Sequence, residues 1–160
     1  MLYLLCFGNP YLSEDNLALL VADLIIKEKI KGLEVIKCVS PDELLHYTDK
    51  NFIILDVVKG LTKTELINDI DTLKANNIVT LHDFDLGFFL KLMKETNKID
   101  KDKIRIIGIP QHLKNGSAKT LKDEVLRLIP IKTKHSWKNK LNQTPSPKKP
   151  STQETNPKKT

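Results

Sequence analysis

The sequence has little of what would mark several common protein classes. Its 160 residues include only two cysteines and six glycines. Two thiols make no disulfide framework, and we interpret Cys6 and Cys38, in or beside apolar runs, as buried hydrophobic residues of a protein in a reducing cytoplasm. The turn "FGNPYL" contains only Gly8, whereas a dinucleotide-binding GxGxxG loop requires three glycines. No HExxH metalloprotease motif is present.

Long apolar runs are also missing. No uninterrupted run approaches the roughly 18 residues that a membrane-spanning helix needs. The N-terminus starts with a strand pattern and shows no basic region followed by an apolar stretch and a cleavage site, so we expect no signal peptide and no membrane partner.

The positive charge is concentrated near the C-terminus. The net charge is +6, but eight of the 26 basic residues lie in residues 131–160 with only one of the 20 acidic residues. The remainder is near neutral, which argues against a nucleic acid partner. Because the basic segment is rich in Pro, Ser, Thr and Lys, we predict an α/β domain over residues 1–133 and a disordered tail over 134–160.

Apolar runs alternate with helical patterns along the first 130 residues. Continuous apolar runs are typical of strands that are covered on both faces, and the alternation predicts a largely parallel sheet. We therefore expect a three-layer α/β fold with helices on both faces of a five-stranded sheet of order 2-1-3-4-5. The five strands are expected within residues 1–7, 33–39, 51–58, 76–83 and 103–110, and residues 59–76 are too polar and irregular to assign.

Two of the expected helices carry start signals. Ser13 can cap a first helix in which Glu14 and Asp15 occupy the first turn. Ser40, followed by Pro41 and Glu43, has the pattern of a capping box at the start of a short second helix. Helical patterns at residues 86–96 and 118–129 complete the prediction.

Polar side chains follow the expected strands at their carboxyl ends, where sites of open α/β sheets lie. They are Asn9, Glu14 and Asp15 after strand one, Asp56 at the end of strand three, His82 and Asp83 after strand four, and Gln111 and His112 after strand five. Acids near a helix start are often structural, and a half-buried histidine often is too. Asp56 needs a partner, because a carboxylate buried among apolar neighbours is costly when it is alone.

The carboxylates and the imidazole are better explained together, as a metal site, than as separate structural residues. Two carboxylate oxygens and one imidazole nitrogen suit a divalent ion such as Ni²⁺ or Zn²⁺, with positions left open for substrate or water. The spacing alone does not name the ion. Cys6 has no neighbouring histidine and is a poor candidate for a nucleophile.

The segment "CFGNPYLSEDNLALLVADLI" resembles the N-terminal signature of the [NiFe]-hydrogenase maturation endopeptidases. "IILDVVKG" and "VTLHDFDLGFFLKLM" are similar to the family segments that carry its metal-binding aspartate and histidine, and "IRIIGIP" is similar to its fifth strand. The resemblance covers about residues 1 to 130. Position by position, it implies that Asp15, Asp56 and His82 are the metal ligands and catalytic residues, and that Asn9 and Glu14 lie at the substrate.

The resemblance implies a function as well. It implies cleavage of a C-terminal extension from the hydrogenase large-subunit precursor, with nickel carried by that precursor and with no organic cofactor. Two departures stand out: Leu17-Ala18 replaces a usual glycine, and "PQHLKNG" does not keep the usual order of residues. The oligomeric state is not fixed by the sequence, and a monomer is the simplest expectation.

Two alternatives stay open. A phospho-acceptor receiver domain has the same expected sheet and similarly placed acids, but its lysine after strand five is replaced here by Pro110 and Gln111. A family member that binds a precursor or metal without cutting it would carry the same residues.

Overall fold

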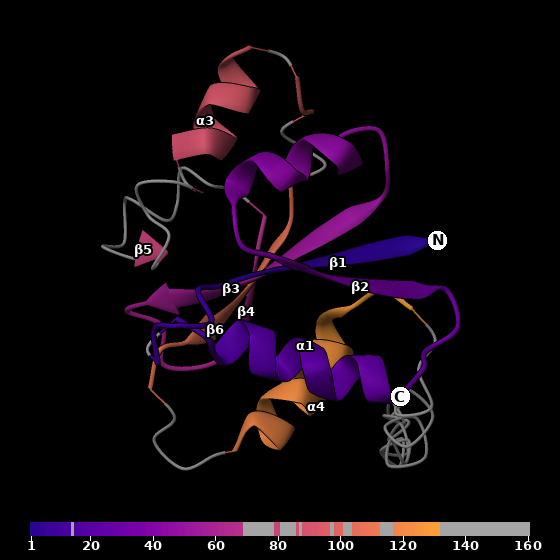
Figure 1. Cartoon of the computed structure of the whole chain (residues 1–160), viewed down its shortest axis with the longest axis vertical. Coiled ribbons are helices and arrows are strands. Elements are labelled where there is room, and N and C mark those ends of the chain that lie inside the picture. Colours follow the sequence, from indigo (N-terminus) through magenta and orange to yellow (C-terminus); the bar gives the residue numbers. More distant parts are fainter. Residues whose placement is uncertain are drawn as a thin grey trace, which may run out of the picture.

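The computed structural model describes residues 1–13, 15–68, 79–80, 86, 88–96, 98–100, 104–112 and 117–131. Its centre is a mostly parallel sheet (Figure 1) of order β2-β1-β3-β6-β4, and β5 pairs with β3. β1 pairs in parallel with β2 and β3, and β3 pairs in parallel with β6, whereas β4 and β5 are antiparallel to their partners. The bounds are Leu2–Phe7 (β1), Leu33–Cys38 (β2), Phe52–Lys59 (β3), Glu65–Ile67 (β4), Val79–Thr80 (β5) and Ile106–Pro110 (β6). The predicted α/β class is confirmed.

The strand order differs from the prediction in one detail, which concerns the neighbour of β3. Among the described residues, the predicted fourth strand is represented by β5, whose two residues pair antiparallel with Val58 and Lys59. The expected fifth strand, β6, therefore lies directly beside β3. The far edge is formed by β4, from the segment too polar to assign. Among the described residues β4 pairs with β6 alone, and its Leu66 is partly exposed.

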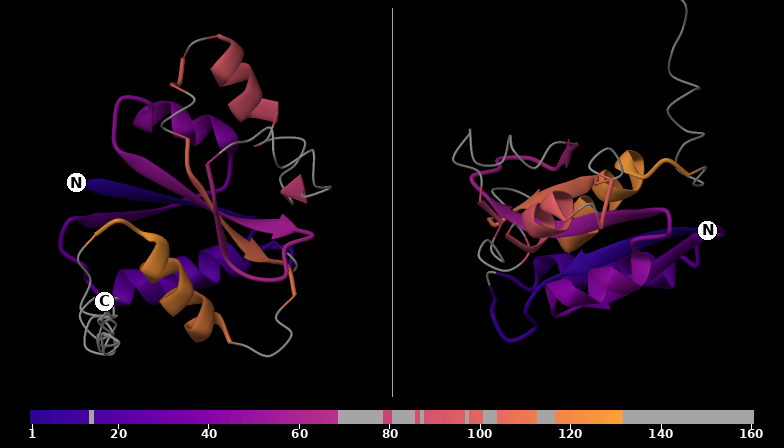
Figure 2. Two further views of the ribbon diagram at one scale, coloured as in Figure 1. Left: turned by 180° about the vertical axis from the view of Figure 1, so that it is seen from behind. Right: turned by 90° about the horizontal axis from the view of Figure 1, so that it is seen from above.

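Helices cover both faces of the sheet (Figures 1 and 2). Alternate residues of β3 explain this arrangement, because successive side chains of a strand point to opposite faces. Ile53, Leu55 and Val57 belong to the core under α1 and α4, whereas Ile54 and Val58 belong to the core under η1 and α3. The bounds are Leu17–Lys27 (α1), Pro41–Tyr47 (η1, a 3-10 helix), Phe88–Glu95 (α3) and Ala118–Leu128 (α4). The predicted three layers are confirmed.

The predicted start of the first helix is wrong, and that of the second is confirmed. α1 begins at Leu17 with Asn16 at the N-cap, so Ser13 is no cap and Asp15 precedes the helix. The reason is that the Asp15 carboxylate bonds back to the turn before the helix. In η1, by contrast, the Glu43 carboxylate accepts hydrogen bonds from the backbone of Ser40 and of the preceding residue, as a capping box requires.

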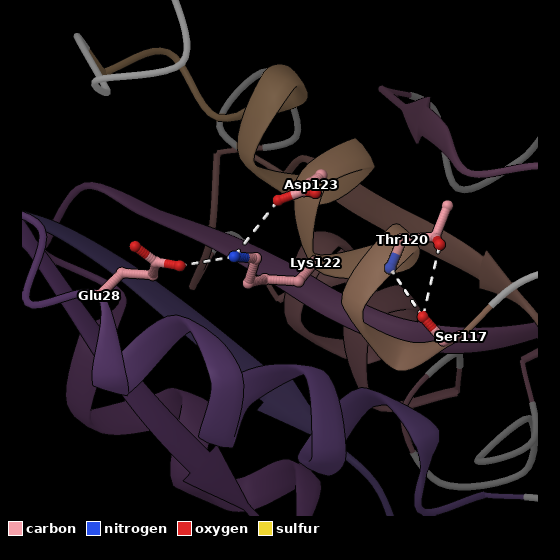
Figure 3. A network of polar contacts seen from close by, with 5 residues as sticks. All are labelled: Glu28, Ser117, Thr120, Lys122 and Asp123. Carbon is pink, nitrogen blue, oxygen red and sulfur yellow. Dashed lines mark hydrogen bonds and ion pairs between the residues drawn. The ribbon is translucent and has the colours of Figure 1, made fainter.

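A buried lysine ties the end of α1 to α4 (Figure 3). Lys122 is 6% exposed, and its Nζ lies 2.5 Å from Glu28 Oε1 and 3.3 Å from Asp123 Oδ1. The hydrogen bond that Lys122 donates to Glu28, opposed by burial, raises the pKa of Lys122, so the side chain is charged at neutral pH. This buried cation therefore has opposite charges beside it.

The predicted tail, residues 134–160, lies outside the described residues, so the division at residue 133 stays a prediction. Within the part of the chain that the structure describes, no helix combines the length and apolar character needed to cross a membrane.

Candidate active site

The turn after β1 brings Asp15 back against Gly8, at the end of the strand. Gly8 is buried, and a Cβ at this position would lie 2.5 Å from the carbonyl oxygen of Asp15 and 3.1 Å from Leu19 Cγ. Only glycine allows this approach without a backbone shift. The chain therefore leaves β1, forms a loop, and returns to the end of the strand with Asp15.

Hydrogen bonds fix the shape of this loop. The Tyr11 N–H donates to Asn9 Oδ1 at 2.9 Å, and the Leu12 N–H donates to the Asn9 carbonyl at 3.2 Å. The Asn9 N–H in turn donates to Asp15 Oδ2 at 2.9 Å. Asp15 is 4% exposed. The hydrogen bond from the Asn9 N–H holds its carboxylate at the end of β1.

The second carboxylate, that of Asp56, lies on the central strand β3 and is fully buried. By alternation its side chain is on the η1 and α3 side of the sheet, in line with Ile54 and Val58. The Val57 N–H donates to Asp56 Oδ1 at 2.8 Å. Asp56 Oδ2 is buried and has no hydrogen-bond partner among the described residues. A buried oxygen in this state is unfavourable for stability and is available to a cation or a proton.

The pKa of Asp56 depends on its burial and on the charge of Asp15. Burial, and then the charge of Asp15, raise the pKa of Asp56 well above its ordinary value, and the bond from Val57 only partly opposes this. β1 and β3 are adjacent, Asp15 is held at the end of β1, and Asp56 lies near the carboxyl end of β3, so both carboxyl groups lie at the same end of the sheet. Such a pair can share a proton or bind a cation between its oxygens.

The structure places two of the five predicted site residues, Asp15 and Asp56, at the same end of the sheet, and their roles stay predictions. Asn9 stands beside them, but its backbone N–H and side-chain oxygen are used inside the turn. Glu14 and His82 lie outside the described residues, so their roles stay predictions. In the described ranges, no three His, Cys, Asp or Glu side chains gather as a metal site would require. The two carboxylates fit a divalent ion as a partial set of oxygen ligands.

Sequence reasoning missed Gly108, which faces Asp56 across β3 and β6. A Cβ there would lie 2.7 Å from Leu61 Cδ1 and 3.0 Å from Val58 Cγ2. The missing side chain leaves that space to Leu61 and Val58 on the Asp56 side of the sheet. The signal was visible as a glycine inside the apolar run "IRIIGIP", where a strand glycine marks close packing.

The cysteines take no part in this site. Both are free and buried, as predicted. Burial raises the pKa of the Cys6 thiol well above its ordinary value and that of Cys38 to about 12. Neither is a thiolate at neutral pH, so neither is an activated nucleophile.

Several solved structures share this architecture. [NiFe] hydrogenase maturation protease HybD from Thermococcus kodakarensis aligns over 79% of this chain and 97% of its own, at 20% identity and a TM-score of 0.59. The fold is that of a hydrogenase maturation protease. The Hydrogenase 3 maturation protease (19% identity, TM-score 0.57) and the endopeptidase HybD from E. coli (17%, 0.56) each align over 79% of this chain and 87% of their own.

Comparisons of sequence give no such match. No family model matches the chain, and no curated protein matches it. At these identities the likeness establishes the fold, and the chemistry has to be argued from the residues of the site.

Proposed function

We propose that the protein is an endopeptidase that removes a C-terminal extension from a [NiFe]-hydrogenase large-subunit precursor. The observation that carries this proposal is the buried pair of Asp15 and Asp56 at the carboxyl ends of β1 and β3. The fold shared with hydrogenase maturation proteases supports it, and so does the resemblance of the turn and strand segments to that family.

In this proposal the metal is nickel already bound in the substrate. Asp15, Asp56 and His82 would contact this nickel, since two oxygen donors and an imidazole suit the ion. The contact would fix the scissile bond beside the site, and the ion would supply Lewis-acid polarisation of a carbonyl or a water. The protein itself would contribute positioning, because the turn backbone orients the Asp15 carboxylate and the Val57 N–H orients that of Asp56. Asn9 and Glu14 would lie beside the bound substrate, and the reaction would take place in the cytoplasm.

The experiment is cleavage of a nickel-loaded precursor that still carries its extension, followed by mass spectrometry. We expect the wild-type protein to release the extension and Asp15→Asn, Asp56→Asn and His82→Ala to lose at least about 100-fold in rate, the usual scale for a group at the reacting centre. The exposed Asp49→Asn and His46→Ala variants are matched controls and should cleave normally. Normal cleavage by Asp15→Asn or Asp56→Asn would contradict the assignment.

The same assay addresses the alternative of a non-cleaving member. Wild-type protein that binds the loaded precursor and never releases the extension would support binding without cutting. The receiver alternative is disfavoured by the sheet, because receiver domains have the order 2-1-3-4-5 and here β6 lies directly beside β3. Incubation with acetyl phosphate and Mg²⁺ should leave the protein unphosphorylated.

A further inference from the structure

Asn9 takes part in the turn after β1 through both its backbone and its side chain. Its backbone N–H donates to Asp15 Oδ2 at 2.9 Å, and its side-chain Oδ1 accepts the Tyr11 N–H, also at 2.9 Å. The second bond has the pattern of an Asx turn, in which an asparagine side chain bonds to the backbone two residues further on. One residue therefore links the shape of the turn to the Asp15 carboxylate.

The orientation of the Asn9 carboxamide follows from this bond. Tyr11 presents an N–H, which only the oxygen of the carboxamide can accept, so the NH₂ group points away from it. The next residue, Pro10, has a fixed φ and no N–H of its own, so it restricts the turn without competing for this oxygen. The Asn9 side-chain oxygen is therefore committed to the turn.

The backbone and the side chain of Asp15 are held by different contacts. A Cβ on Gly8 would lie 2.5 Å from the Asp15 carbonyl oxygen, and the Asp15 N–H donates to the Leu12 carbonyl at 3.0 Å, so packing and a backbone bond hold the main chain. The carboxylate instead accepts the Asn9 N–H. Removal of the Asn9 side chain should therefore leave the Asp15 main chain in place and loosen its carboxylate.

We propose that the Asn9 side chain is a positioning residue. It holds the turn in the shape in which the Asn9 N–H points at Asp15, and it thereby fixes the direction of that carboxylate. The inference rests on the proposed function, in which Asp15 contacts the metal of the substrate. Asn9 acts through Asp15 and needs no side-chain contact with the substrate. Because a misplacement of about 1 Å at a reacting centre costs up to about 100-fold in rate, this indirect role is measurable.

The first measurement is amide hydrogen exchange by NMR on the full-length protein, which requires no substrate. In Asn9→Ala the side-chain acceptor is lost, so the amides of residues 9 and 11 should both exchange at least about tenfold faster. In Asp15→Ala only the amide of residue 9 should exchange faster, because the bond from Tyr11 to Asn9 remains. The amide of Ile54 on β3 donates to the Arg105 carbonyl at 2.9 Å and is the internal reference, whose exchange should not change.

The second measurement separates kcat from KM with the nickel-loaded precursor. Asn9→Ala should lower kcat at least about tenfold and change KM less than about twofold, because the substrate loses no contact. Asn9→Asp and Asn9→Ser each restore an oxygen acceptor without the NH₂ group, the first with a charge and the second without. The better of the two should come within about threefold of the wild-type kcat.

Asn51→Ala is the matched control for loss of an asparagine side chain. Asn51 is exposed, and its Oδ1 accepts a hydrogen bond from Arg105 at 3.4 Å. It directly precedes β3, at the opposite end of this strand from Asp56. The variant should cleave the precursor at the wild-type rate.

Each outcome decides the inference. Unchanged exchange of the amide of residue 9 in Asn9→Ala would overturn it. A raised KM with unchanged kcat would also overturn it, because the side chain would then contact the substrate directly, as would failure of both Asn9→Asp and Asn9→Ser to recover activity. A wild-type protein that cleaves no precursor would contradict the peptidase proposal, while the exchange rates would still decide whether Asn9 holds the Asp15 carboxylate, so the two can fail separately.

Discussion

Two regions of the molecule bury charge in opposite ways. Between α1 and α4, Lys122 lies against Glu28 and Asp123, and the partly exposed carboxylates neutralise it (Figure 3). At the carboxyl end of the sheet, Asp56 is buried beside another aspartate, and one of its oxygens has no hydrogen-bond partner among the described residues. The first arrangement stabilises the fold, and the second weakens it.

The difference shows where the fold keeps unfavourable electrostatics. A like-charge pair with a strongly perturbed pKa is typical of a functional site, whereas a lysine with opposite charges beside it is typical of a structural contact. Substitutions in the two regions should therefore separate activity from stability.

The largest effect is expected for Asp56→Asn. Asparagine keeps the acceptor for the Val57 N–H and removes the charge opposite Asp15, so cleavage should fall at least about 100-fold while the free energy of unfolding rises. Activity with the loaded precursor and urea denaturation of the same sample measure both. A destabilised Asp56→Asn protein would show that the pair supports the fold.

Gly8→Ala should damage both properties at once. The added Cβ meets the backbone oxygen of Asp15, which cannot move as a side-chain end can, so we expect a loss of about 1–3 kcal/mol in stability together with reduced cleavage. Gly32→Ala is the control, because Gly32 has φ +85° and open space around it. It should lose about 1 kcal/mol through backbone strain and leave precursor cleavage by the folded protein unchanged.

Lys122→Met should lower stability and leave cleavage unchanged, which is the opposite of the result expected for Asp56→Asn. Methionine fills much of the space of the lysine stem but leaves Glu28 and Asp123 without their cation. Because both carboxylates are partly exposed, the cost should be modest, about 1 kcal/mol. Thermal melts should show the loss, and the cleavage rate at 25 °C should equal that of the wild type.

The smallest effect is a difference in pH dependence between the two regions. The folded-state pKa of Asp56 is raised, so the folded protein holds this proton more tightly, and stability falls as pH rises above the ordinary value of 3.8. The pKa of Lys122 is also raised, so its contribution is present at neutral pH and is lost only above about 10.5. In urea denaturation from pH 4 to 7, the stability of Asp56→Asn relative to the wild type should increase with pH. The stability of Lys122→Met should change with pH in the same way as that of the wild type.

The sequence predicted the parallel core well because burial on both faces leaves continuous apolar runs, as in β1 and β3. It left the segment of β4 unassigned, and it placed a strand where β5 lies without predicting that β5 pairs antiparallel with β3. In both strands the pairing with a neighbour, rather than the side-chain pattern, sets the direction. For the site, the rule for carboxyl ends predicted Asp15 and Asp56, and the structure buries both side chains. The helix start at Leu17 could not be predicted, since Ser13 and Asp15 look like a cap and a first turn until the bond from Asn9 to Asp15 is known.

The two buried thiols allow opening of the folded protein to be measured by thiol labelling. Cys6 and Cys38 are both 0% exposed and carry raised pKa values, so a thiol reagent such as Ellman's reagent should modify neither in the native state. Cys6 lies on the internal strand β1, where access requires large-scale opening, and Cys38 ends the edge strand β2, which can open more locally. The rate of labelling would then follow opening of the sheet without any introduced probe.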